Sequence, residues 1–244
     1  MADGEVRFRD KVRGLSDLPV RFVSGVVMAA IVGVAVWLGS WWWSGLVILL
    51  AGLVLWEWNR LVRGFDVSGL SEITWMFFGA VYVSAAAYAM IEARNSYVPM
   101  FFILGFLAPV VAVDVGAYFV GRAVGGPKIA PSISPSKTWA GLGGGALAAS
   151  AVAIAVLYSF PDAGHYGEAS IEGVTISNVL AAIFAGIAIA VLAQAGDFFE
   201  SWMKRRAGRK DSSNLIPGHG GVFDRLDGFL AVFSILFITR IMIG

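Results

Sequence analysis

Long apolar stretches alternate with short polar connections along this chain. Each stretch is continuous, without the period-two alternation of a membrane barrel, and is close to the roughly twenty residues that a helix needs to cross a bilayer core. The predicted spans are 20–38, 42–60, 73–92, 98–119, 139–160, 176–198 and 225–243. Because lipid offers the backbone no hydrogen-bond partners, the pattern predicts an all-α, polytopic integral membrane protein of about seven or more transmembrane helices.

The composition agrees with this pattern. Of the 244 residues 58% are hydrophobic and 14% are charged, whereas a soluble domain carries about 25% charged residues. The chain has no cysteine, which excludes disulfides and thiolate metal sites. No soluble domain fits between the spans. We therefore interpret 1–244 as a single transmembrane domain, with hydrophobic helices over 1–96 and the chemistry-bearing helices and loops over 97–244.

Lysine and arginine fall almost entirely on one side of this arrangement. That side holds Arg7, Arg9, Lys11, Arg13, Arg21, Arg60, Arg63, Arg122, Lys128, Lys137, Lys204, Arg205, Arg206, Arg209, Lys210 and Arg225. Only Arg94 and Arg240 fall on the other side. Because cytoplasmic loops are enriched in Lys and Arg, the pattern predicts a cytoplasmic N-terminus in the cell inner (plasma) membrane.

Carboxylates interrupt the apolar pattern at the cytoplasmic ends of three spans. A charge inside a span is costly and usually faces a protein interior or a wet cavity. Two sets have the i, i+3 or i+4 spacing that places side chains on one helix face, and one aspartate stands alone. The candidate metal ligands are Asp197, Glu200 and Ser201; Asp224 and Asp227; and Asp114. Such oxygen ligands favour a hard cation, Mg²⁺ above all.

For any single carboxylate the alternative is neutralisation by a neighbouring cation. Asp197 could pair with Lys204 or Arg205, and Asp224 with Arg225. The clustering of all of them at one depth favours a metal site over a set of separate ion pairs.

Two basic, glycine-rich loops lie on the same side as the carboxylates. Their cations, hydroxyls and backbone N–H groups suit a phosphate, although the G-x-x-x-x-G-K-[ST] loop is missing. The candidate substrate-binding residues are Lys128, Ser134, Lys137, Lys204, Arg205, Asp211, Gly220, Gly221 and Arg225. For Arg206 and Arg209 a role in topology is the stronger interpretation. Lys210 and His219 are predicted to act in catalysis with Asp197, Asp224 and Asp227; for His219 a helix-capping role is the alternative.

Carboxylates for a divalent cation and cations for phosphate at one membrane surface indicate phosphoryl or nucleotidyl transfer. At this point a family resemblance is evident. Residues 201–227, SWMKRRAGRKDSSNLIPGHGGVFDRLD, resemble the signature of the phosphatidate cytidylyltransferases, the CDP-diacylglycerol synthases, at every fixed position. The segments DVGAYFVGR and KIAPSISPSKTWAGLGGG are also similar to that family, whereas 1–96 matches it only in being hydrophobic.

The resemblance implies transfer of a cytidylyl group from CTP to phosphatidate, giving CDP-diacylglycerol and pyrophosphate in phospholipid biosynthesis. It also implies Mg²⁺, a second cation such as K⁺, a homodimer in membrane lipid, and no nucleic acid. Family metal ligands match Asp197, Ser201, Asp224 and Asp227; we expect Asp197 and Asp224 to hold Mg²⁺, with Asp227 ligating or orienting. Val115 departs from the family, in which Thr is common at that position.

Two other functions stay open from the residues. A CDP-alcohol phosphotransferase would carry a D-G-x-x-A-R…G-x-x-x-D-x-x-x-D pattern, which this chain lacks. An ion-coupled transporter could use Asp114, Asp197 and Asp227 as a relay. It predicts charges near the midplane and inverted repeats, whereas these charges lie towards one membrane surface.

Overall fold

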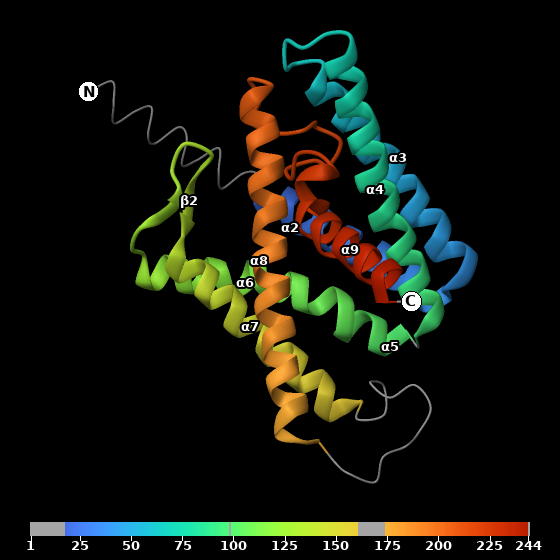
Figure 1. Cartoon of the computed structure of the whole chain (residues 1–244), viewed down its shortest axis with the longest axis vertical. Helices are drawn as coiled ribbons and strands as arrows, with labels where there is room; N and C mark the ends of the chain where they lie inside the picture. The colour runs from blue at the N-terminus through green and yellow to red at the C-terminus, as the bar shows by residue number, and fades with distance from the viewer. Residues whose placement is uncertain (1–17, 98, 161–173, 244) are drawn as a thin grey trace.

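The computed structural model describes residues 18–97, 99–160 and 174–243, which are mostly helical. The elements are drawn in Figure 1. They are α2 (Leu18–Leu38), α3 (Ser40–Val62), α4 (Leu70–Ser96), α5 (Pro99–Phe102), the π-helical turn η1 (Ile103–Leu107), α6 (Ala108–Val124), β1 (Lys128–Ala130), β2 (Ser134–Thr138), α7 (Trp139–Ser159), α8 (Ile176–Arg206) and α9 (Phe223–Ile243). The basic arm before α2 lies outside the described residues.

Six helical stretches of the described chain are long and apolar enough to cross a membrane: α3, α4, Pro99–Val124, α7, α8 and α9. The first predicted span falls on α2, whose apolar part, Phe22–Leu38, is shorter than the others. The predicted fold class, an all-α polytopic membrane protein, is confirmed at this level.

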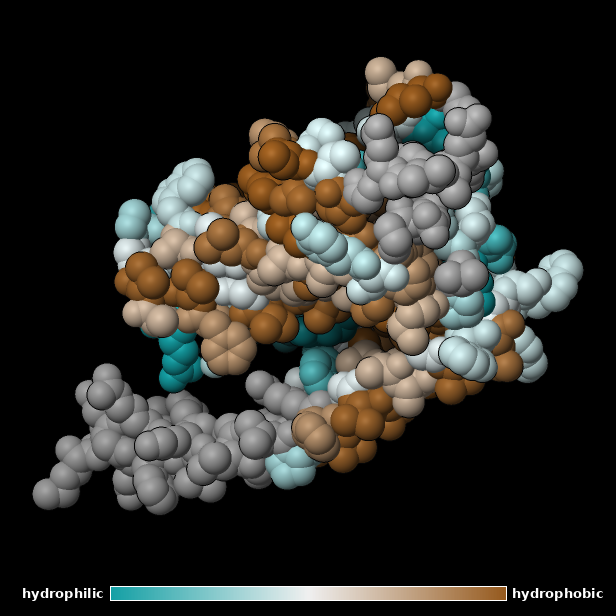
Figure 2. Space-filling view, turned by 90° about the horizontal axis from the view of Figure 1, so that it is seen from below, coloured by the Kyte–Doolittle hydropathy of each residue, from teal (hydrophilic) through white to brown (hydrophobic). Residues whose placement is uncertain are grey.

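The surface of the helices is apolar where a soluble protein would be charged. Large side chains such as Phe22, Trp41, Phe77 and Phe184 are each exposed over more than two thirds of their area. Figure 2 shows broad brown patches of such side chains over the helices. Exposed apolar area on this scale is typical of a surface that faces lipid.

The helices pack in two groups that share α9. In one group α2 packs on α3, α3 on α4, and α4 on α9; in the other α6 packs on α7, α7 on α8, and α8 on α9 (Figure 1). The first core contains the fully buried Trp58 and Phe233, and the second contains Val113, Ala190 and Val232. Helix α9 therefore contacts both halves of the chain.

Glycine allows α8 and α9 to cross closely beside the candidate carboxylates. A Cβ on Gly196 of α8 would collide with the backbone oxygen of Asp227 and lie 2.7 Å from Ala231 Cβ. On the opposite helix, a Cβ on Gly228 would lie 3.3 Å from Ala193 Cβ. Small residues at such a contact bring backbones together where lipid supplies no hydrophobic drive.

A small antiparallel hairpin occupies the region expected to be an irregular loop between the fourth and fifth spans. Strand β1 pairs with β2 in the register Lys128↔Thr138 and Ala130↔Ser134, with a bulge between them. Gly125 and Gly126, both at positive φ, end α6 before the hairpin. At its other end Thr138 Oγ1 accepts from the N–H of Gly141 at 3.0 Å and caps α7. The strands are too short for a clear alternation, which is why the sequence pattern did not reveal them.

Candidate active site

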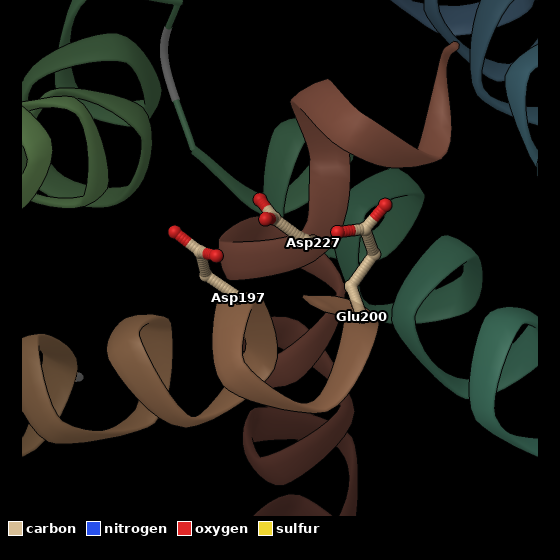
Figure 3. A group of neighbouring side chains, drawn as sticks. All are labelled: Asp197, Glu200 and Asp227. Carbon is tan, nitrogen blue, oxygen red and sulfur yellow. The ribbon is translucent and has the colours of Figure 1, made fainter. Parts of the chain in front are cut away.

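Three carboxylates from two helices converge where α8 passes the start of α9. Asp197 and Glu200 lie one turn apart on α8, and Asp227 comes from the second turn of α9; one oxygen of each lies within 4.8 Å of the others. Figure 3 shows all three on the side of α8 that faces α9. Ser201 Oγ lies 3.3 Å from Asp197 Oδ1 as a donor. The i, i+3 spacing and the glycine crossing together produce this cluster.

Two lysines reach the cluster from different elements. Lys137, the residue before the α7 cap, forms an ion pair with Asp197. Lys204 Nζ lies 2.5 Å from Glu200 Oε2 and 2.6 Å from Asp224 Oδ1, so it bridges α8 and α9. Glu200 is only 1% exposed and Asp224 only 6%. The sequence suggests Lys204 or Arg205 as a partner of Asp197, and Arg225 as a partner of Asp224. The described ion pairs instead join Asp197 to Lys137, and Asp224 to Lys204.

Asp224 is engaged more completely than Asp227. Besides Lys204, its Oδ2 accepts from Ser212 N at 2.9 Å, Ser212 Oγ at 2.6 Å and Gly221 N at 2.8 Å. Asp227 Oδ1 accepts from the N–H of Gly228 at 2.7 Å. Asp224 thus ties the loop 207–222 to α9, whereas Asp227 lies among the carboxylates of α8.

Glu57 of α3 is a site residue that the sequence reasoning missed. It is fully buried, and its carboxylate accepts from Val222 N at 2.9 Å, Phe223 N at 2.6 Å, Ser212 Oγ at 3.2 Å and Ser213 Oγ. The available signal was a single acidic residue inside the predicted span 42–60, which alone argues for a function or a buried partner.

The histidine of the signature contacts the first helix. His219 Nδ1 lies 2.8 Å from Ser24 Oγ on α2, and the same hydroxyl donates to Pro217 O at 3.1 Å. Arg225 Nε donates to the backbone oxygen of His219 at 3.2 Å. Gly220, at φ +84°, allows the turn that pairs Ile216 with Gly220. His219 therefore lies where α2 and this loop meet.

The other predicted residues lie outside the three-carboxylate cluster. Lys128 Nζ donates to Ser136 O at 3.4 Å within the hairpin, and Ser134 pairs with Ala130 across it. The side chains of Arg205, Lys210 and Asp211 are exposed. Asp114 is exposed on α6 and does not belong to the three-carboxylate cluster found among the described residues.

The donor set fits a divalent cation. Four carboxylates, those of Asp197, Glu200, Asp224 and Asp227, are paired with two lysines, which leaves two negative charges without a cation in this part of the described chain. Three of these groups offer oxygen atoms within the spread that one ion spans. Hard oxygen ligands and a twofold negative charge are what Mg²⁺ requires.

Fold and site together define a polytopic membrane protein with an acidic, lysine-paired centre of the kind that handles a metal and phosphate groups. The chain matches the model of the cytidylyltransferase family over residues 66–242. It belongs to that family, and the resemblance stated from the motifs is confirmed. Glu57 lies outside the matched range.

Several bacterial proteins named phosphatidate cytidylyltransferase are similar over most of the chain. The protein of Brucella suis biovar 1 (strain 1330) is 36% identical over 206 residues, which cover 80% of this chain and 71% of that protein. The protein of Rickettsia bellii (strain RML369-C) is 35% identical over 226 residues, covering 92% and 91%. That of Haemophilus influenzae (strain ATCC 51907 / DSM 11121 / KW20 / Rd) is 35% identical over 195 residues, covering 79% and 62%.

Proposed function

We propose that this chain transfers the cytidylyl group of CTP to phosphatidate, forming CDP-diacylglycerol and releasing pyrophosphate. The observation that carries the proposal is the cluster of Asp197, Glu200 and Asp227 with Lys137 and Lys204, of which Asp227 and Lys204 belong to the signature 201–227. The names of the similar bacterial proteins give the same reaction. The residues are suited to a substrate that brings several negative phosphate charges.

Asp197, Glu200 and Asp227 would hold Mg²⁺, with Ser201 and Asp224 beside them; a second cation such as K⁺ is part of the same proposal. The bound metal would supply charge neutralisation on the phosphate groups. Asp224 has the separate task of holding Lys204 and the loop in place.

In this reaction the protein forms no covalent bond to the substrates; it positions them and stabilises their charge. The phosphatidate phosphate is ionised at neutral pH, so its oxygen attacks the α-phosphorus of CTP with no dedicated base. The bond from this phosphorus to the β-phosphate oxygen breaks, and pyrophosphate leaves with the electron pair. Lys137 and Lys204, together with the exposed Lys128, Arg205 and Lys210, would offset the charge of the triphosphate and of the leaving group.

The membrane arrangement follows the same proposal. We place the N-terminus and the active site on the cytoplasmic side of the cell inner membrane, count α2 as the seventh span, and expect a homodimer. The contact of Ser24 with His219 and Pro217 supports this sidedness, because it joins the start of α2 to the basic loop after α8. CTP then comes from the cytosol and phosphatidate from the lipid.

The test is an assay of purified protein in detergent with labelled CTP, phosphatidate and Mg²⁺. We expect label in the lipid phase from the wild type, and a fall of about 10³-fold for Asp227→Asn, equivalent to about 4 kcal/mol of transition-state stabilisation. Glu92→Gln is the matched control, because Glu92 pairs with Arg240 at 2.5 Å far along α9 from the site.

Label that stays wholly in the aqueous phase with folded wild type would overturn the proposed reaction. Uptake of an ion by reconstituted vesicles in that case would favour the transporter. Full activity of Asp227→Asn would overturn the metal assignment.

A further inference from the structure

Helix α9 begins without a side-chain cap from its own sequence. The first N–H groups of a helix have no partner inside it and are usually satisfied by a Ser, Thr, Asp or Asn just before the first turn. Here the preceding residues are Gly220, Gly221 and Val222, which have no such side chain. The carboxylate of Glu57, from α3, accepts from Val222 N and Phe223 N instead.

The same carboxylate also holds the loop that precedes α9. The hydroxyl of Ser213 donates to Glu57, and the single hydroxyl proton of Ser212 is shared between Asp224 Oδ2 at 2.6 Å and Glu57 Oε2 at 3.2 Å. A Cβ on Gly221 would collide with Ser212 Oγ and Glu57 Oε1, so the close approach requires glycine at this position. Glu57 is thus connected through the hydroxyl of Ser212 to Asp224, the aspartate that accepts from Lys204.

The next residue of α3 supports the same two helices through its ring. Trp58 is 1% exposed and contacts Phe223 of α9 and Phe199 of α8, with ring centroids 5.8 Å and 5.7 Å away. Phe223 and Phe199 immediately precede Asp224 and Glu200 in the chain. Two consecutive residues of α3 therefore contact the segments that carry the carboxylates.

The negative charge of Glu57 is balanced by neutral donors. Within the described residues Glu57 forms no ion pair with a lysine, arginine or histidine. A buried charge is tolerated when hydrogen bonds satisfy it. Here the N–H groups of Val222 and Phe223, at the positive end of a helix dipole, and the hydroxyl of Ser213 do so, and the hydroxyl of Ser212 is shared with Asp224. All of these donors belong to the segment 212–223, so the contact fixes the position of that segment against α3.

We propose that Glu57 is a positioning residue of the active site: it fixes the start of α9, and with it Asp224 and Asp227, against α8. This inference rests on the proposed cytidylyltransferase reaction and extends it to a residue of the N-terminal half, outside the range 66–242 that matches the family. Glu57 itself touches no carboxylate of the metal cluster; it acts through the backbone of Val222 and Phe223 and through Ser212.

The test compares Glu57→Gln with Glu57→Asp and the wild type. Glutamine keeps the size but turns one oxygen into an NH₂ group, which then faces the N–H of either Val222 or Phe223. Because misplacement of reacting groups by about 1 Å can cost about 100-fold in rate, we expect kcat to fall by about 100-fold for Glu57→Gln, with KM for CTP changed only a few-fold. Aspartate keeps the charge and should recover part of kcat.

A second readout needs no substrate. Binding of Mg²⁺ to the folded state raises Tm, so the gain in Tm on adding Mg²⁺ alone reports the geometry of the cluster. We expect Glu57→Gln to lose more than half of the wild-type gain, and the control Glu92→Gln to keep it. Hydrogen exchange of the segment 211–227 should be faster in Glu57→Gln than in the wild type.

The outcomes separate positioning from mere structural support. A lower Tm in Glu57→Gln, with wild-type kcat and a wild-type response to Mg²⁺, would overturn the positioning role. Where Glu57→Gln does not fold, the Ser213→Ala variant is tested instead. It removes one hydrogen-bond donor to Glu57 and changes no residue of the carboxylate cluster. A reduced Mg²⁺ response in Ser213→Ala supports the role, and an unchanged response overturns it.

The same experiment distinguishes the two proposals. Wild-type protein that makes no CDP-diacylglycerol, yet loses its Mg²⁺ response on Glu57→Gln, would refute the reaction and keep the positioning role. Active wild type with an indistinguishable Glu57→Gln variant would keep the reaction and refute the positioning role.

Discussion

The carboxylates of Asp197, Glu200 and Asp224 have lysine partners, whereas the carboxylate of Glu57 on α3 has only neutral donors among the described residues. Glu200 and Asp224 share Lys204, and Asp197 pairs with Lys137, so each has a side-chain cation as a partner, and Asp224 also accepts from Ser212 and Gly221. Glu57 is held by backbone N–H groups and serines. A cation can be exchanged for a metal or rearranged around a phosphate, whereas a helix start cannot. The first arrangement suits chemistry and the second suits alignment.

Removing Lys204 should give the largest effect on the carboxylate cluster. Lys204→Met leaves two carboxylates, Glu200 and Asp224, buried without their cation, and breaking a buried pair costs about 3–5 kcal/mol. We expect the free energy of unfolding in detergent to fall by this amount and activity to be nearly lost. Added Mg²⁺ should recover part of the stability, because it supplies the missing positive charge.

A matched control for this variant is Arg240→Ala, which breaks the ion pair between Arg240 and Glu92. The Arg240 side chain is 62% exposed. Such pairs contribute about 0–1 kcal/mol. Equal losses of unfolding free energy for Lys204→Met and Arg240→Ala would contradict the distinction between the buried and the exposed ion pair.

The crossing of α8 and α9 should respond to one added methyl group. Gly196→Ala places a Cβ against the backbone oxygen of Asp227, so the helices must separate. Overpacking of this kind costs about 1–3 kcal/mol, and the displaced Asp227 should lower kcat by about 10-fold to 100-fold. Chemical denaturation and steady-state kinetics measure the two effects.

The comparison variant for this crossing lies in the N-terminal half. Gly52→Ala on α3 places its Cβ where no atom lies within 4 Å, so it should stabilise the helix by about 0.5–1 kcal/mol and leave kcat unchanged. A loss of activity in Gly52→Ala as large as that in Gly196→Ala would show that the effect is not specific to the site.

The contact between α2 and the signature loop should give the smallest effect. Ser24→Ala removes the hydrogen bond to His219 and the one to Pro217 O. Because a typical hydrogen bond contributes about 1 kcal/mol net to stability, we expect the free energy of unfolding to fall by about that amount. Activity should stay within a few-fold of the wild type. Thr74→Ala is the control, since Thr74 Oγ1 donates to Leu70 O within its own helix. A fall of about 100-fold for Ser24→Ala would assign His219 a more direct role than its contacts suggest.

Much of the site could be read from local spacing. Asp197, Glu200 and Ser201 share a face of α8 because their separation matches the helix period, and Asp224 and Asp227 do so on α9. Asp114 interrupts an apolar span as Asp197 does, but it lies outside the three-carboxylate cluster found among the described residues, and its role as a ligand stays a prediction. Spacing within one helix does not reveal which helices cross.

Partners across the fold were the main point that local reasoning missed. The alternative to a metal site paired Asp197 with Lys204 or Arg205, and Asp224 with Arg225. In the fold Asp197 pairs with Lys137, from the hairpin before α7, and Asp224 pairs with Lys204 of α8. The hairpin of β1 and β2 was also missed, because three-residue and five-residue strands leave no periodic signal.

The sequence by itself determined the class of the molecule: apolar runs of spanning length dictate transmembrane helices, and the signature between 201 and 227 dictates the chemistry of the residues. Tertiary structure alone decided which of those residues meet. Gly196 sets how closely α8 and α9 cross, and Glu57, separated from its partners Phe223 and Ser213 by more than half of the chain, sets where α9 begins. The physical reason is that a helix period fixes neighbours only within a few residues, whereas burial in a low-dielectric interior obliges distant polar groups to find one another.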